Sequence, residues 1–140
     1  MGADRAARLR LASGLVLLAF AATHFINHAL GIVSLGAMER GREVFLAAWR
    51  SPPGTLLLYG AFLVHIALAL AKLYQRRSLR MPPWQALQIA LGLTIPLLLT
   101  VHVVGTRGLH LAGVEDGYAY LLLVLWPDGA VRQGLMLLVV

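Results

Sequence analysis

Three long apolar segments constrain the fold of this chain more than any other feature of its sequence. They cover residues 11–35, 55–73 and 84–105, and each is close to the ~20 residues that a helix needs to cross the hydrocarbon of a bilayer. Hydrophobic residues make up 59% of the chain and charged residues 13%, which is roughly half the charged fraction of a soluble domain. We therefore expect an all-α transmembrane helical bundle, with no space in 140 residues for a separate catalytic domain.

The segments between the spans carry charged and helix-breaking residues. In residues 36–54, charged and apolar side chains alternate at helical spacing, which predicts a short amphipathic helix in the membrane interface with Trp49 as its aromatic anchor. Ser51 and the two prolines after it end this helix and begin the second span. Pro82 and Pro83 mark the start of the third span in the same way.

Lysine and arginine are distributed unevenly between the two ends of the spans. One side holds Arg5, Arg8, Arg10, Lys72, Arg76, Arg77 and Arg80. The other side holds Arg40, Arg42, Arg50 and Arg107, together with Glu39, Glu43, Glu115 and Asp116. Because cytoplasmic loops are enriched in Lys and Arg, we expect the N-terminus and the linker at residues 75–83 in the cytoplasm. The net charge of +6 then follows from membrane topology and does not indicate a nucleic-acid partner.

The C-terminal third departs from this pattern of full spans. Residues 118–126 are apolar but too short to cross a bilayer, and we expect them at the interface. Asp128 is a candidate N-cap for a helix from Gly129 onward, and at ~1.5 Å per residue that helix is about halfway across when the chain reaches Val140. We therefore expect residues 1–140 to be one membrane-anchor domain, with three full spans plus the start of a fourth, from a larger module.

Four of the five histidines lie inside the apolar segments: His24 and His28 in the first, His65 in the second and His102 in the third. The bilayer core offers an imidazole no water, so an ionisable residue there indicates a functional site. The chain has no cysteine, and so has no thiolate haem ligand and no iron–sulfur cluster. The three spans contain no Asp or Glu that would accompany the histidines in a proton pathway. The pattern therefore favours axial ligation of the iron of haem b by histidine.

Helix face and depth predict how the histidines pair. His24 and His28 are four residues apart and share one face of their helix. Measured from the cytoplasmic side, His28 and His102 both lie at about 26 Å, and His24 and His65 at about 16–20 Å. We therefore expect His28 to pair with His102, and His65 to pair with His24 or with a histidine on further helices. Small residues beside these histidines would let a porphyrin approach the backbone: Ala21, Gly31, Ala61 and Ala69.

Three further residues are candidates for binding the cofactors. Arg107 is close in depth to His28 and His102 and is a candidate partner for the haem propionates. Arg10 and Ser13, one turn apart and with Trp84 nearby, would suit a quinone head group at the cytoplasmic end. Simpler explanations stand beside both: a snorkelling arginine, and the basic and aromatic residues that flank any span.

Three stretches of the sequence resemble a bacterial membrane module: residues 13–31, which include THFINHALG, residues 59–65 (YGAFLVH) and residues 100–107 (TVHVVGTR). The module is the six-helix haem-b anchor at the N-terminus of some class III adenylate cyclases. It is similar to the cytochrome b subunits of succinate dehydrogenase and fumarate reductase. The resemblance covers the whole chain but only about the first half of the anchor. It implies a multi-pass protein of the bacterial inner membrane, with haem b held by histidine, contact with the quinone pool and redox control of a cyclase domain.

Three functions remain open from the sequence. The first is the haem-b anchor of an adenylate cyclase, although no cyclase domain or metal-binding aspartate is present in these residues. The second is the cytochrome b membrane subunit of a respiratory dehydrogenase, which would pass electrons to quinone. The third is a cofactor-free scaffold whose histidines only hydrogen-bond helices together. The partners expected are lipid, quinone, and C-terminal helices or a cyclase domain, and a homodimer is compatible with the pattern.

Overall fold

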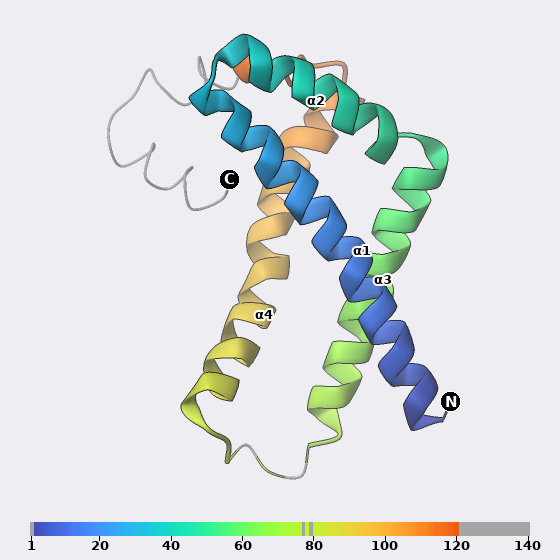
Figure 1. Cartoon of the computed structure of the whole chain (residues 1–140). Coiled ribbons are helices and arrows are strands. Elements are labelled where there is room, and N and C mark those ends of the chain that lie inside the picture. Colours follow the sequence, from blue (N-terminus) through green and yellow to red (C-terminus); the bar gives the residue numbers. More distant parts are fainter. Residues whose placement is uncertain (1, 77, 79, 121–140) are drawn as a thin grey trace. The chain divides into compact units, whose positions relative to one another are not determined.

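The computed structural model describes residues 2–76, 78 and 80–120, and every regular element among them is helical (Figure 1). These elements are α1 (Ala3–Ala29), a 3₁₀ turn (Leu30–Ile32), α2 (Leu35–Trp49), α3 (Pro52–Tyr74), α4 (Pro83–Val103), a π-helical turn (Val104–Gly108) and α5 (Leu109–Leu111). Residues 121–140 lie outside the described part. Most of the predicted interfacial segment and the predicted start of a fourth span fall there.

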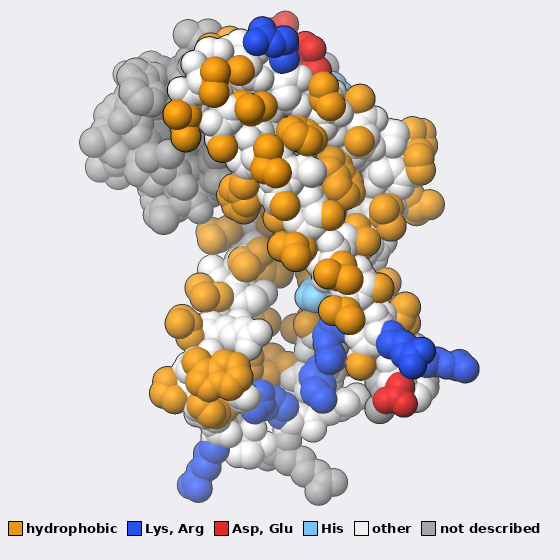
Figure 2. Space-filling view, viewed as in Figure 1, with side chains coloured by type: hydrophobic (Ala, Val, Ile, Leu, Met, Phe, Trp, Pro, Cys, Tyr) orange, Lys and Arg blue, Asp and Glu red, His pale blue; other side chains and the backbone are white. Residues whose placement is uncertain are grey.

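Within the described residues, three helical stretches are long and apolar enough to cross a membrane: Asp4–Ile32, Pro52–Tyr74 and Pro83–Leu111. At most 6% of the apolar window of each stretch is buried in the protein. On the face seen in Figure 2, hydrophobic side chains cover the helices, and Lys and Arg gather near the helix ends. Outward-facing apolar side chains on such helices match a lipid environment, where only structures that satisfy their own backbone groups can span. The chain is therefore an all-α, multi-pass membrane protein, as predicted.

The starts of α3 and α4 agree with the sequence, whereas the first membrane stretch, Asp4–Ile32, begins and ends earlier than predicted and the third continues past Gly105 to Leu111. Ser51 caps α3 by accepting a hydrogen bond from the Gly54 N–H at 3.1 Å, with Pro52 and Pro53 in the first turn. Pro83 likewise begins α4. α1, however, begins at Ala3 and not near residue 11. Long basic side chains can extend toward the lipid head groups while their backbone remains helical, so the basic flank belongs to the helix.

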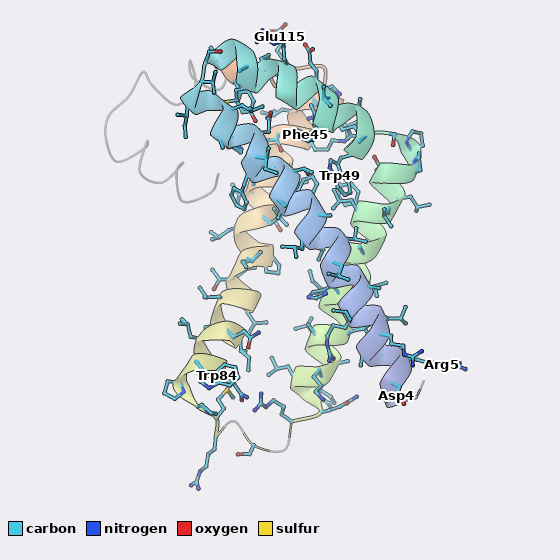
Figure 3. All side chains as sticks on the ribbon, in the orientation of Figure 1. Asp4, Arg5, Phe45, Trp49, Trp84 and Glu115 are labelled. Carbon is cyan, nitrogen blue, oxygen red and sulfur yellow. The ribbon has the colours of Figure 1, made fainter. Side chains whose placement is uncertain are left out.

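The chain divides into two units, Met1–Arg77 and Ser78–Val140. In the first unit α1 packs antiparallel against α3, so that the start of α1 and the end of α3 lie at the same end (Figure 1). The amphipathic helix α2 follows α1 and packs against it, which confirms the predicted helix. The indole N–H of Trp49 donates to Thr23 Oγ1 at 3.0 Å on α1 (Figure 3). A half-buried indole needs such a partner, so Trp49 links α2 to α1. Its role as an aromatic anchor in the membrane interface stays a prediction.

Few side chains are fully buried in the described part of the first unit. They are Ala61, Ser13 and Asn27, which are 8%, 6% and 4% exposed. A Cβ added at Gly41 on α2 would overlap Oδ1 of Asn27 and a methyl group of Leu30. Only glycine therefore allows α2 to lie this close to the end of α1. Small residues at contacts between helices are typical of membrane bundles, because they let the backbones approach.

Candidate functional site

His24 and His28, called here the histidine pair, contact each other on α1. Their Nε2 atoms are 3.2 Å apart and their ring planes are nearly perpendicular, at 79°. The predicted shared face is therefore confirmed. Because a neutral imidazole has one donor and one acceptor nitrogen, one ring donates its Nε2–H and the other accepts.

The geometry of the histidine pair limits how it can hold a haem. The two axial nitrogens of a bis-histidine haem lie on opposite faces of the porphyrin with the iron between them. Two rings in direct contact along one helix cannot occupy both positions. At most one of the two histidines can ligate a given iron, and the second ligand has to come from another helix. The prediction that His28 pairs with His102 satisfies this requirement but joins the two units, and it stays a prediction.

Aromatic side chains surround the histidine pair. The ring of Phe20 stacks on His24, with centroids 5.8 Å apart and an interplanar angle of 11°. Phe20 also meets the ring of Trp49 edge-on at 5.3 Å. These contacts connect His24 to α2, a connection that the sequence analysis missed. The available signal was the position of Phe20, four residues before His24 and hence on the same helix face.

His65 lies against the N-terminal half of α1, far from the histidine pair. Its Nδ1 is 3.3 Å from Ser13 Oγ and 3.2 Å from the carbonyl oxygen of Arg10. Ser13 and His24 are roughly 16 Å apart along α1 at ~1.5 Å per residue. The predicted alternative that His65 shares an iron with His24 is therefore wrong. The depth estimate treated each helix separately, whereas the packing of α3 on α1 brings His65 to Ser13.

Arg10, Ser13, Gly14 and His65 together are called here the His65 site. The sequence analysis proposed Arg10 and Ser13 for a quinone and treated His65 separately, whereas the structure brings the three together. Ser13 is almost completely buried, and its hydroxyl donates to the Arg10 carbonyl at 3.1 Å. Trp84, the third residue considered for the quinone, belongs to the second unit.

His102 and Arg107 lie at the end of α4 and in the π-helical turn that follows. Both are half-buried, and the His102 carbonyl accepts a hydrogen bond from Thr106 Oγ1 at 2.8 Å. Hydrogen bonds in a π-turn join residues five apart. The turn therefore brings Arg107 closer to the helix face of His102 than a regular α-helix would. Such turns are frequent at functional sites.

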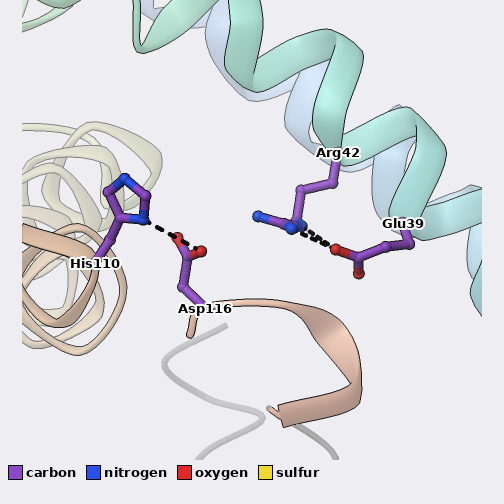
Figure 4. Close-up of polar contacts among 4 residues, drawn as sticks. All are labelled: Glu39, Arg42, His110 and Asp116. Atoms are coloured by element: carbon purple, nitrogen blue, oxygen red, sulfur yellow. Dashed lines mark hydrogen bonds and ion pairs between the residues drawn. The ribbon is translucent and has the colours of Figure 1, made fainter. Parts of the chain in front are cut away.

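The remaining histidine, His110, is exposed. Its side chain is 44% exposed, and its Nδ1 is 3.5 Å from Oδ1 of Asp116 (Figure 4). In the part of the chain that the structure describes, no group of three or more His, Cys, Asp or Glu side chains could hold a metal ion. A haem iron takes only its axial ligands from the protein, so pairs of histidines are the relevant arrangement.

Comparison of the chain with known protein families, with curated proteins and with solved structures finds no match.

Proposed function

We propose that this chain is the haem-b-binding part of a membrane anchor that senses redox state or exchanges electrons with quinone, and that it regulates an attached adenylate cyclase domain. The observation that carries the proposal is the placement of three histidines at two levels of the α1–α3 pair, with His65 at one level and His24 with His28 at the other. The sequence has no Asp or Glu between Asp4 and Glu39 or between Glu43 and Glu115. Intramembrane imidazoles without carboxylates suit haem iron better than a proton pathway.

Particular residues of the chain would hold the haem and the quinone. As the sequence predicts, His28 and His102 would hold one iron. The contact between His24 and His28 prevents those two from ligating the same iron. Haem b, when bound, supplies a one-electron redox centre. Arg107 would neutralise a propionate through a charge-assisted hydrogen bond. A quinone head group would meet the guanidinium of Arg10, since the hydroxyl of Ser13 is buried against His65.

The proposed location is the bacterial inner membrane, with the N-terminus and the linker before α4 in the cytoplasm. The antiparallel packing of α1 and α3 supports this orientation. It places Arg5 and Arg8 at the same end of the helix pair as Lys72 and Arg76. Lys and Arg concentrated at one end of a helix pair are typical of the cytoplasmic side.

A cofactor-free scaffold is the second candidate function. It is favoured by the hydrogen bonds that the histidines make within the protein, above all the bond from His65 to α1. Such interhelical bonds stabilise membrane proteins without any cofactor. A respiratory cytochrome b subunit would use the same histidines as the anchor, and would co-purify with flavoprotein and iron–sulfur subunits instead of carrying a cyclase domain.

Absorption spectroscopy of the purified protein in its oxidised and reduced states tests the proposal. We expect the bands of a six-coordinate b-type haem, and we expect them to be lost in His28→Ala and in His102→Ala. His110→Ala is the matched control, because it removes an exposed imidazole that is not assigned to an iron. Protein without haem bands, or with bands that survive both ligand substitutions, would support the scaffold.

A further inference from the structure

His65 is held by a single turn of α1. The Arg10 carbonyl lies 3.2 Å from Nδ1 and the Ser13 hydroxyl 3.3 Å from it. One turn earlier on α3, Ala61 is buried, which allows the two helices to approach at this point. The side chain of His65 therefore reaches from one helix to the backbone of another.

The contacts determine which nitrogen of His65 carries the proton. A carbonyl oxygen only accepts hydrogen bonds, so the contact with Arg10 requires a proton on Nδ1. Ser13 donates its own hydroxyl hydrogen to the same carbonyl at 3.1 Å. Its oxygen is then able to accept from the Nδ1–H of His65. This arrangement satisfies all three contacts and leaves the lone pair of His65 on Nε2.

Gly14 completes the site by leaving room for the ring. A Cβ at this position would lie 3.2 Å from Cε1 and 3.5 Å from Nδ1 of His65. The first distance is tighter than ordinary van der Waals contact, so a Cβ at this position would require the imidazole to shift by a few tenths of an ångström. The ring is thus positioned by a carbonyl, a hydroxyl and a glycine within one turn of α1, at residues 10, 13 and 14.

We propose that the Arg10 carbonyl and the Ser13 hydroxyl are positioning groups that hold His65 as its Nδ1–H tautomer and present Nε2 as an axial ligand to a haem iron, at a level separate from the histidine pair. Ligating histidines generally donate their second ring N–H to a carboxylate, a backbone carbonyl or water, which orients the ring and raises its basicity. The His65 site has this arrangement. The proposal rests on the proposed function for the haem itself and adds the ligating atom and its supports.

Spectroscopy of the purified full chain tests the positioning groups. The His65-dependent signal is the reduced-minus-oxidised haem absorption that disappears in His65→Ala. We expect Ser13→Ala to lower the haem content behind this signal by up to about 10- to 100-fold, the usual cost of removing an outer hydrogen-bond partner of a metal ligand, and to shift its midpoint potential. Gly14→Ala should lower it less, because the ring needs to shift by only a few tenths of an ångström and both hydrogen-bonding groups remain. Thr94→Ala is the control, since it removes a hydroxyl that donates to a carbonyl of its own helix at 2.9 Å.

A second measurement uses the protein without haem. In ¹⁵N NMR spectra of protein with labelled histidine, we expect His65 to be protonated on Nδ1, and we expect Ser13→Ala to shift that resonance while Thr94→Ala does not. An Nε2–H tautomer of His65 would overturn the proposal, because Nε2 would then have no lone pair for iron.

The outcomes separate this proposal from the proposed function. Full haem retention in His65→Ala, together with loss in His28→Ala, would overturn the role of His65 and leave the haem anchor standing. An absence of haem from every preparation would refute both. An unchanged spectrum, potential and His65 resonance in Ser13→Ala would also contradict the positioning role, whether or not His65→Ala folds.

Discussion

The His65 site and the histidine pair hold their imidazoles by different means. His65 is fixed from another helix, by the carbonyl of Arg10 and the hydroxyl of Ser13. His24 and His28 are fixed by each other on one helix, through Nε2 atoms 3.2 Å apart. The first arrangement depends on how α1 packs against α3, whereas the second depends on two side-chain conformations on α1.

This difference determines how ready each site is to bind a metal. A carbonyl can only accept, so it selects one tautomer of His65 in advance. An imidazole can donate or accept, so the contact between His24 and His28 does not by itself fix the tautomer of either ring. Because the two Nε2 atoms are 3.2 Å apart, the pair has to separate before either nitrogen meets an iron. His65 is preorganised, and the histidine pair is not.

The largest expected effect comes from breaking the histidine pair. His28→Ala should remove most of the haem absorption that depends on His102, because it removes a proposed ligand. His24→Ala should retain that absorption, because it frees Nε2 of His28 from its contact. Haem content per protein in the two variants measures the difference. The opposite result, with loss in His24→Ala alone, would move the ligand to His24.

The second largest effect should come from forcing α1 and α3 apart. Ala61→Leu inserts a larger side chain into the tightest part of this contact, and overpacking of this kind costs about 1–3 kcal/mol. We expect a lower free energy of unfolding and a loss of the His65-dependent signal. The haem absorption that depends on His28 should stay the same. Ala67→Leu is the matched control, because Ala67 is exposed on the same helix. Equal effects of the two variants would contradict the packing at Ala61.

The sequence predicts one of these two sites much better than the other. The contact between His24 and His28 follows from their four-residue spacing, which is local to one helix. The contact between His65 and Ser13 depends on where α1 crosses α3. Hydrophobic periodicity does not encode that crossing, since both helices are apolar on every side. Gly14 and Ala61 permit it, but small residues are common along both helices and do not single it out.

The start of α1 was also predicted less closely than the starts of the other two spans. The apolar run begins near residue 11, but the helix begins at Ala3, because arginine side chains do not end a helix at the membrane surface. By contrast, the starts of α3 and α4 are encoded by local chemistry, a serine cap and prolines, and were predicted closely. Features set by neighbouring residues can therefore be predicted here, and those set by contacts between helices cannot.

A smaller effect is expected from Trp49→Phe, which tests the link between the histidine pair and α2. The variant keeps an aromatic ring beside Phe20 but removes the hydrogen bond to Thr23. Interhelical hydrogen bonds in membranes contribute about 0.6 kcal/mol on average. We expect the free energy of unfolding to fall by about that amount and the haem absorption that depends on His28 to change slightly. Trp84→Phe, at a residue that is 63% exposed, should change neither.

The smallest effect is expected from Glu39→Gln on α2. Arg42 Nε donates to Oε1 of Glu39 at 2.6 Å (Figure 4), and the pair lies one helical turn apart with 21% and 31% of the two side chains exposed. Ion pairs near the surface contribute about 0–1 kcal/mol, so the free energy of unfolding should change little. The haem absorption that depends on His28 and that which depends on His65 should both stay the same. Equilibrium unfolding at low and high salt, with spectra of each sample, measures this. A change confined to the haem absorption that depends on His28 would mean that the charges of α2 act electrostatically on His24 and His28. The properties of the histidine pair would then depend on α2 as well as on α1.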